Sequence, residues 1–175
     1  MRILTVRQPW AWAIIHGGKD VENRVRNIAG GYRGPVAIHV AQANAEFSPS
    51  EVTPPSERHL SGVMAAHRDS VADGEVWPWY RDRGSIIGVV DLTDAHLVEQ
   101  SNGMSNVCFD DHTPIGAICS PWAQNYVEFP GYEGYHLVLA NPRPLTEPIP
   151  YRGALGLRHL DDDTTARILA QLGGA

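Results

Sequence analysis

Residues 7–24, RQPWAWAIIHGGKDVENR, join an apolar stretch to a charged one across two glycines. Pro9 suits the first position of a helix, and Gly17 or Gly18 suits its end, so a short helix is predicted over PWAWAIIHG. Because nearly every residue of this helix is apolar, most of its surface should be buried. The polar residues KDVENR follow at once as an extended or turn segment, so the buried helix should fix where they lie.

Strands are predicted on both sides of this stretch. RILTV (2–6) and GPVAIHVA (34–41) alternate as strands do, and His39 is expected on the face opposite Val36, Ile38 and Val40. The near-continuous β-branched run SIIGVVDLTDAHLV (85–98) is typical of a strand buried on both faces.

The later part of the chain is predicted to hold a hairpin. GAICSPWAQNYVEF (116–129) and EGYHLVLANPRPL (133–145) have strand patterns, and the PGYEG turn would join them. Residues 99–116 are expected to form a polar loop, and the aspartates at 161–163 are candidates for capping a last amphipathic helix.

The length of 175 residues, 43% of them hydrophobic, suits one domain with a substantial core. We therefore predict a single domain over residues 1–175 of the α+β class. Its centre would be a small mixed or antiparallel β-barrel of about five to six strands, decorated with short helices. A helical, Pro-rich insertion is expected around 48–84, and a C-terminal helix around 161–172.

The formal charge of −6 argues against binding of long nucleic acid through bulk electrostatics, which needs a basic face. The charge is unevenly placed, because residues 1–40 hold six basic and two acidic residues. A cationic site on an acidic body suits a small or locally recognised anionic ligand.

Other classes of protein are disfavoured by the same sequence. The apolar run PWAWAII is far shorter than the roughly 20 residues that span a bilayer, so no membrane span is expected. Two cysteines do not make the disulfide framework of a small secreted protein, which favours a cytoplasmic location.

The sequence contains no glycine-rich phosphate loop and no familiar metal-binding motif. HGGK lacks the spacing of a P-loop. His96, Cys108, His112 and Cys119 contain possible zinc ligands, but their C-x3-H-x6-C spacing is not a familiar ligand pattern. The sequence therefore predicts neither a metal nor a cofactor.

Five motifs follow one another along the chain: LTVRQPWAWAIIHGGKDVENR, YRGPVAIHVA, IIGVVDL, CSPWA, and YHLVLANPRPL with PYRGALGL. Together they resemble the ASCH domain family, named for homology to an activating signal cointegrator. This resemblance covers most of residues 2–158 and leaves out 48–84, 99–116 and the C-terminal helix. It implies a PUA-like fold, a small, partly open β-barrel with a cleft over one end.

The resemblance also implies a range of activities. Members of the family have been linked to nucleic-acid binding, to ribonuclease action and, in a shorter branch, to hydrolysis of the acetyl amide of acetylcytidine. In that amidohydrolase branch a threonine stands at the position of Glu22, and a glutamate cannot repeat a hydroxyl nucleophile.

The candidate catalytic residues are Lys19, Glu22 and Arg24, which match the family's G-x-K-x-x-E-x-R positions. If 22–24 are extended, Glu22 and Arg24 point to the same side and Lys19 folds onto them. A lysine beside a carboxylate can transfer protons if burial lowers its pKa, and an arginine fork can bind a phosphate or carboxylate. The alternative is a purely structural ion network.

Further residues are candidates for binding a nucleotide. Gln8 and Trp10 flank the Pro9 turn, where an amide can read a base edge and an indole can stack on a base. Trp122 beside Ser120 is a second candidate stacking platform, although core packing is the alternative for both tryptophans. His39 is either at the cleft or a partly buried imidazole. The full set is Arg7, Gln8, Trp10, Asn23, His39, Ser120 and Trp122.

These observations support three hypotheses. The leading one is a protein that binds RNA or a modified nucleotide in a cationic cleft. The second is a hydrolytic enzyme that uses the same cleft, either a metal-independent ribonuclease or an amidohydrolase acting on a modified nucleoside, with Lys19 as proton-transfer group. The third is a protein-interaction module that uses residues 48–84.

Overall fold

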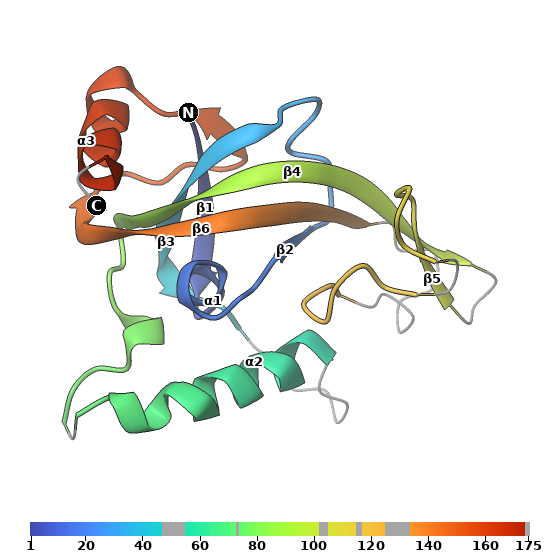
Figure 1. Cartoon of the computed structure of the whole chain (residues 1–175), viewed down its shortest axis with the longest axis horizontal. Helices are drawn as coiled ribbons and strands as arrows, with labels where there is room; N and C mark the ends of the chain where they lie inside the picture. The colour runs from blue at the N-terminus through green and yellow to red at the C-terminus, as the bar shows by residue number, and fades with distance from the viewer. Residues whose placement is uncertain (47–54, 73, 102–104, 115–116, 125–133, 174–175) are drawn as a thin grey trace.

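The computed structural model describes residues 1–46, 55–72, 74–101, 105–114, 117–124 and 134–173. Within these ranges seven strands form one curled, mixed sheet in the order β2-β6-β4-β3-β1-β7, with β5 paired to β4 (Figure 1). Among the strands of the described ranges, only β1 and β3 are parallel neighbours. The strands are β1 (Arg2–Gln8), β2 (Val21–Arg24), β3 (Gly34–Asn44), β4 (Ser85–Ser101), β5 (Ser105–Cys108), β6 (Gly134–Pro150) and β7 (Leu157–His159).

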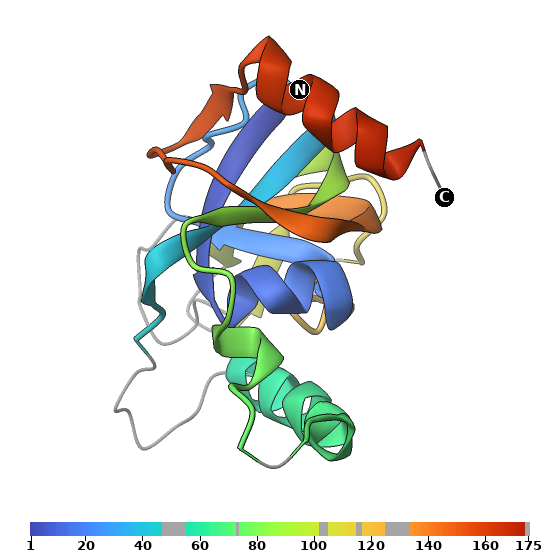
Figure 2. The same cartoon turned by 90° about the vertical axis from the view of Figure 1, so that its left-hand side faces the viewer.

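Three α-helices of the described residues accompany the sheet. Helices α1 (Trp10–His16) and α3 (Asp162–Leu172) lie on opposite sides of it, and α2 (Pro55–His67) lies beyond α1 (Figure 2). Short 3-10 helices follow at Arg68–Ser70 and Pro78–Tyr80. Within the part of the chain that is described, no helix is long and apolar enough to cross a membrane.

The sheet has an apolar core on each face because apolar side chains occupy both sides of its central strands. On β1, Leu4 and Val6 join a cluster with Ile14 of α1. Ile3 points the other way and joins Ile168 of α3. This alternation along one strand explains why a helix is needed on each side.

Helix α1 is positioned by the residues at its two ends. The Gln8 side-chain oxygen accepts a hydrogen bond from the Trp12 backbone nitrogen at 2.9 Å, which satisfies a donor left open at the helix start. Pro9 precedes the first helical residue, one position earlier than predicted. At the other end Gly18 has a φ of +73°, a conformation that favours glycine. The chain is thus turned directly from α1 into Lys19 and β2.

The α+β prediction is confirmed, with seven strands among the described residues instead of the five or six expected. Two local predictions are wrong. Residues 99–116 are not simply a loop, because β4 continues to Ser101 and pairs with β5. Residues 117–124 form turns instead of a strand, and the predicted PGYEG turn lies mostly outside the described residues. Pro121 cannot donate a ladder hydrogen bond, which disfavours a strand at this place.

Candidate functional site

A cleft of about 960 Å³ opens over one end of the curled sheet. Its walls come from β1, β2, the second half of β3, and the loop between β6 and β7. Six of the predicted site residues line it: Arg7, Trp10, Glu22, Asn23, Arg24 and His39. The other four, Gln8, Lys19, Ser120 and Trp122, lie behind its surface and are buried.

Strand β2 presents two charged side chains to the cleft. Glu22 and Arg24 are two residues apart on an extended strand and therefore point to the same side, as predicted. Arg24 Nη2 lies 3.0 Å from Glu22 Oε1 and donates to the Thr5 carbonyl oxygen at 3.1 Å. The guanidinium is held at the cleft wall, and part of it remains open to solvent.

Lys19 lies directly beneath this pair. Its Nζ is 3.8 Å from Glu22 Oε2 and donates a hydrogen bond to the Val21 carbonyl oxygen. The same ammonium lies 5.2 Å from the ring centre of Trp10 and 5.8 Å from that of Trp122, within reach of cation–π attraction. Only 3% of Lys19 is exposed. Burial lowers the pKa of Lys19 below its ordinary value, and the nearby charge of Glu22 partly offsets this effect.

The residues around Trp122 form the support behind Lys19. Trp122 is 3% exposed and packs edge-to-face against Trp10 at 6.5 Å and against His59 of α2 at 4.5 Å between ring centres. Ser120 donates to an Asp20 carboxylate oxygen and accepts from the Trp122 backbone nitrogen at 3.0 Å. In this structure both residues are therefore in the core behind the cleft, away from its surface.

Asn23 connects the cleft to that same support. Its amide nitrogen donates to the Trp122 carbonyl oxygen at 3.0 Å, and its side-chain oxygen accepts from the Gln124 backbone nitrogen at 2.8 Å. These bonds join β2 to residues 120–124, about 100 positions later in sequence. They hold the loop against the wall of the cleft.

Gln8 and His39 are both engaged by the protein. Gln8 caps α1 and donates to the Arg81 carbonyl oxygen at 3.0 Å, so its amide faces away from the cleft lining. His39 lines the cleft, but only 2% of it is exposed, and its Nε2 lies 3.0 Å from the Tyr151 carbonyl oxygen. Burial lowers the pKa of His39 below its usual value, so the imidazole tends to be neutral.

One wall of the cleft consists of residues that were not predicted as site residues. The loop after β6 contributes Tyr151, Arg152 and Gly153, and Arg152 is exposed. A Cβ atom at Gly153 would lie 2.6 Å from His39 Nδ1, so only glycine allows this close approach. The PYRGALGL motif contained the signal, since it places a basic residue beside a glycine in a segment of the resemblance.

A second group of side chains gathers away from the cleft. Ligand atoms of His96, Cys108, Cys119 and His136 all lie within 4.8 Å of one another. His112, the histidine of the C-x3-H-x6-C spacing, is exposed and lies outside the group. The interaction between the two thiols lowers the pKa of Cys108 and raises that of Cys119. His136 was missed because its position, 17 residues after Cys119, follows no short motif.

The chain is similar to a known domain family and to solved structures of proteins named for it. The ASCH domain family model matches residues 4–149. A crystal structure of a mutant ASCH protein from Zymomonas mobilis has a TM-score of 0.51 and 15% sequence identity, covering 97% of this chain and 96% of that one. A crystal structure of the ASCH protein from the same organism has a TM-score of 0.47 and 13% identity, covering 97% and 93% of the two chains. The family resemblance of the sequence motifs is confirmed, and the first of these structures shares the fold.

Proposed function

The chain belongs to the ASCH domain family, and we propose that its cleft binds single-stranded RNA or a modified nucleotide. The observation that carries this proposal is the lining of the cleft. Three arginines, Arg7, Arg24 and Arg152, share it with the indole of Trp10. Guanidinium groups bind phosphate oxygens, and an aromatic ring offers a face on which a base can stack.

The balance of charge in the cleft favours an anion. Its lining contains three arginines and two glutamates, Glu22 and Glu46. Glu22 is already paired with Arg24 at 3.0 Å and lies 3.8 Å from Lys19. The cleft is thus locally cationic in a chain whose formal charge is −6. Such a site attracts a short stretch of phosphate backbone without the extended basic face that long duplexes need.

The position of the ligand is inferred from the side chains that are accessible in the cleft. Arg7 on β1 and Arg152 on the loop after β6 are both exposed in the lining of the cleft, and both suit phosphate contacts. Trp10, the first residue of α1, lines the cleft and suits base stacking. Lys19 lies beneath the lining and acts on the ligand through Glu22 and Arg24, so we assign it a positioning role.

Fluorescence anisotropy with a labelled single-stranded RNA hexamer tests this proposal. Arg7→Ala and Arg152→Ala should each weaken binding about tenfold, which corresponds to about 1.4 kcal/mol. Each should also reduce the slope of log affinity against log salt concentration by about 0.7, the value for one lost contact to single-stranded phosphate. Arg167→Ala is the matched control, because this exposed arginine lies on α3, outside the cleft.

The outcomes separate the two kinds of ligand. If the hexamer binds and an unlabelled mononucleotide displaces it only weakly, the cleft is an RNA site. If a modified mononucleotide displaces the hexamer strongly, the cleft is a nucleotide site. The proposal fails if the wild-type protein binds neither ligand at low salt. It also fails if the cleft variants bind as tightly as the Arg167→Ala control.

A hydrolytic function is the second candidate, and one observation favours it. Burial lowers the pKa of Lys19, and Lys19 lies beside Glu22, a carboxylate that lines the cleft. A carboxylate in that position can accept a proton from a ribose hydroxyl or from water. The neighbouring Lys19 ammonium would influence how readily Glu22 accepts this proton. We propose to incubate the protein with RNA and with acylated nucleosides. Turnover that disappears in Glu22→Gln supports the enzyme, and turnover that survives this change excludes Glu22 as its base.

A further inference from the structure

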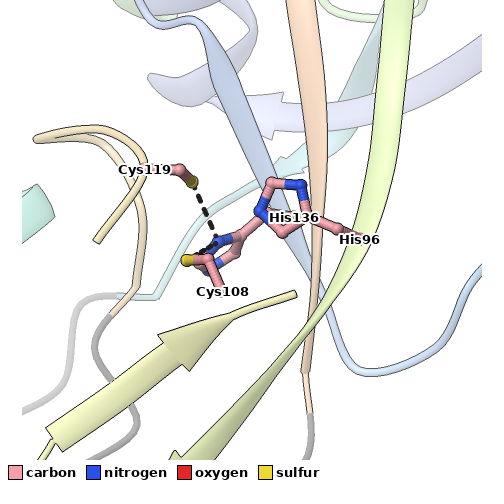
Figure 3. A group of neighbouring side chains, drawn as sticks. All are labelled: His96, Cys108, Cys119 and His136. Atoms are coloured by element: carbon pink, nitrogen blue, oxygen red, sulfur yellow. Dashed lines mark hydrogen bonds between the residues drawn. The ribbon is translucent and has the colours of Figure 1, made fainter. Parts of the chain in front are cut away.

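Four potential metal ligands converge at the opposite end of β4 from the cleft. They are His96 of β4, Cys108 of β5, Cys119 of the segment 117–124, and His136 of β6 (Figure 3). Three of them are buried, and Cys119 is half-buried. Cys119 Sγ lies 3.2 Å and Cys108 Sγ 3.6 Å from His136 Nδ1. This set is distinct from every residue that lines the cleft.

The sheet register explains why three of these side chains meet. His96 is directly opposite His136 in the antiparallel β4–β6 pair, and Val98 is directly opposite Cys108 in the β4–β5 pair. Residues 96 and 98 are two apart on one strand and share a face of the sheet. Cross-strand partners also share a face, so both histidines and Cys108 project to the same side. Cys119 then approaches from the neighbouring segment to complete the group (Figure 3).

The orientation of His96 provides an independent observation. Its Nδ1 lies 2.8 Å from Asp94 Oδ2, and Asp94 is in turn held by Arg33 at 3.2 Å. A carboxylate on one ring nitrogen is the arrangement that fixes a metal-binding histidine, with the other nitrogen directed at the ion. That other nitrogen, Nε2, is buried and makes no hydrogen bond within the described residues. The Asp110 carboxylate lies 3.5 Å from it.

Asp110 is already engaged elsewhere. Its Oδ1 accepts hydrogen bonds from the backbone nitrogens of His112 and Thr113 at 2.7 and 2.6 Å. Its Oδ2 accepts from the Thr113 hydroxyl at 2.7 Å. This carboxylate therefore stabilises its own turn. The group of potential metal ligands consists of two cysteines and two histidines.

We propose that His96, Cys108, Cys119 and His136 form a structural zinc site. Two thiolates and two imidazoles are a preferred tetrahedral set for this ion. With Zn–S near 2.3 Å and Zn–N near 2.0 Å, tetrahedral ligand atoms stand about 3.3–3.8 Å apart. The distances from His136 Nδ1 to the sulfur atoms of Cys119 and Cys108, 3.2 and 3.6 Å, are close to this range. All four ligand atoms lie within 4.8 Å of one another, so small side-chain rotations would bring the others to tetrahedral distances as well.

The ion would tie together parts of the chain that are far apart in sequence. Four protein ligands leave no open coordination position, which is the pattern of structural zinc sites. Cys119 immediately precedes Ser120, which donates a hydrogen bond to Asp20. Trp122, whose ring lies near the Lys19 ammonium, follows three residues after Cys119. The site would therefore anchor the support behind the cleft. A hollow bordered by His96, Cys119 and Phe109 gives the ion a way in from solvent.

Metal analysis of the whole protein, purified under reducing conditions without chelator, tests the proposal. One zinc ion per chain is expected. Co²⁺ added to the metal-free protein should give the intense absorption of tetrahedral cobalt together with thiolate charge-transfer bands. The proposal is overturned if the wild-type protein binds neither Zn²⁺ nor Co²⁺, or if bound Co²⁺ shows no thiolate bands.

Three variants locate the ion. Cys119→Ser should remove the metal, and since Cys119 lies outside the sheet this change should leave the strands paired. His112→Ala is the matched control, because this exposed histidine is close in sequence but outside the group. Asp94→Asn should weaken zinc binding about 10- to 100-fold, as loss of an orienting carboxylate does. Equal metal content in Cys119→Ser and His112→Ala would overturn the assignment.

Discussion

Replacing Glu22 by glutamine removes the carboxylate that lies 3.8 Å from Lys19 Nζ and retains the shape of the side chain. Lys19 is 3% and Glu22 8% exposed, so little solvent surrounds the ammonium when its partner is lost. Removal of one member of a buried ion pair costs about 3–5 kcal/mol. The Val21 carbonyl and the rings of Trp10 and Trp122 still contact the ammonium, so we expect the lower end, about 3 kcal/mol at neutral pH.

The cost should depend on pH with a defined sign. Burial holds the pKa of Lys19 below its ordinary value of 10.5, and loss of Glu22 lowers this pKa further. Between the folded and unfolded pKa values the unfolded chain binds more protons, so the free energy of unfolding rises with pH there. The destabilisation by Glu22→Gln should therefore shrink as the pH rises toward 10.5, since a neutral lysine needs no counter-charge.

Urea denaturation of four proteins measures this effect: wild type, Lys19→Met, Glu22→Gln and the double variant. The double variant should recover most of the stability lost in Glu22→Gln, because no buried ammonium remains. The coupling energy of the pair is the loss in the double variant minus the sum of the losses in Lys19→Met and Glu22→Gln. If Glu22→Gln and the double variant are equally destabilised, and the loss does not change with pH, the buried charge of Lys19 is not the cause.

Three further changes test other parts of the structure. Gly88→Ala should destabilise the protein by about 1–3 kcal/mol in thermal or urea unfolding, because the new Cβ would lie 2.6 Å from Ile15 Cδ1 and 2.8 Å from the Arg143 carbonyl oxygen. Gly153→Ala should displace His39 and weaken RNA binding while circular dichroism stays unchanged, and unaltered affinity would count against this wall of the cleft. Burial lowers the pKa of His39, so the free energy of unfolding should fall as the pH drops from 6.5 through the pKa of the folded state. His39→Gln should make the free energy of unfolding less dependent on pH in this range, and an identical pH dependence in both proteins would contradict this prediction.

Local patterns were sufficient for the first part of the fold. The apolar run that ends at two glycines predicts α1, and the two-residue spacing of Glu22 and Arg24 predicts that they share a side of β2. Both features depend on backbone geometry over a few residues. The position of Lys19 beside this pair also follows from the short turn that begins at Gly18.

Long-range contacts could not be predicted in the same way. Gln8 has the chemistry to read a base, but its hydrogen bond to the Arg81 carbonyl oxygen joins residues 73 positions apart. Trp122 covers Lys19 from behind, which depends on the path of the chain after β5. The pairing of His96 with His136 depends on strand register, which no short spacing encodes. Tertiary contacts therefore decided which polar residues face the cleft.

The central claim is that the cleft binds a single-stranded RNA or nucleotide ligand, and a nitrogen–proton NMR titration tests it most directly. We predict that an RNA hexamer shifts the indole signal of Trp10 and the guanidinium signals of Arg7, Arg24 and Arg152, all of which line the cleft. The indole of Trp79, buried beside Trp12 on the far side of α1, should not move. Absence of saturable shifts at these four residues, or shifts that appear only elsewhere, would contradict the account.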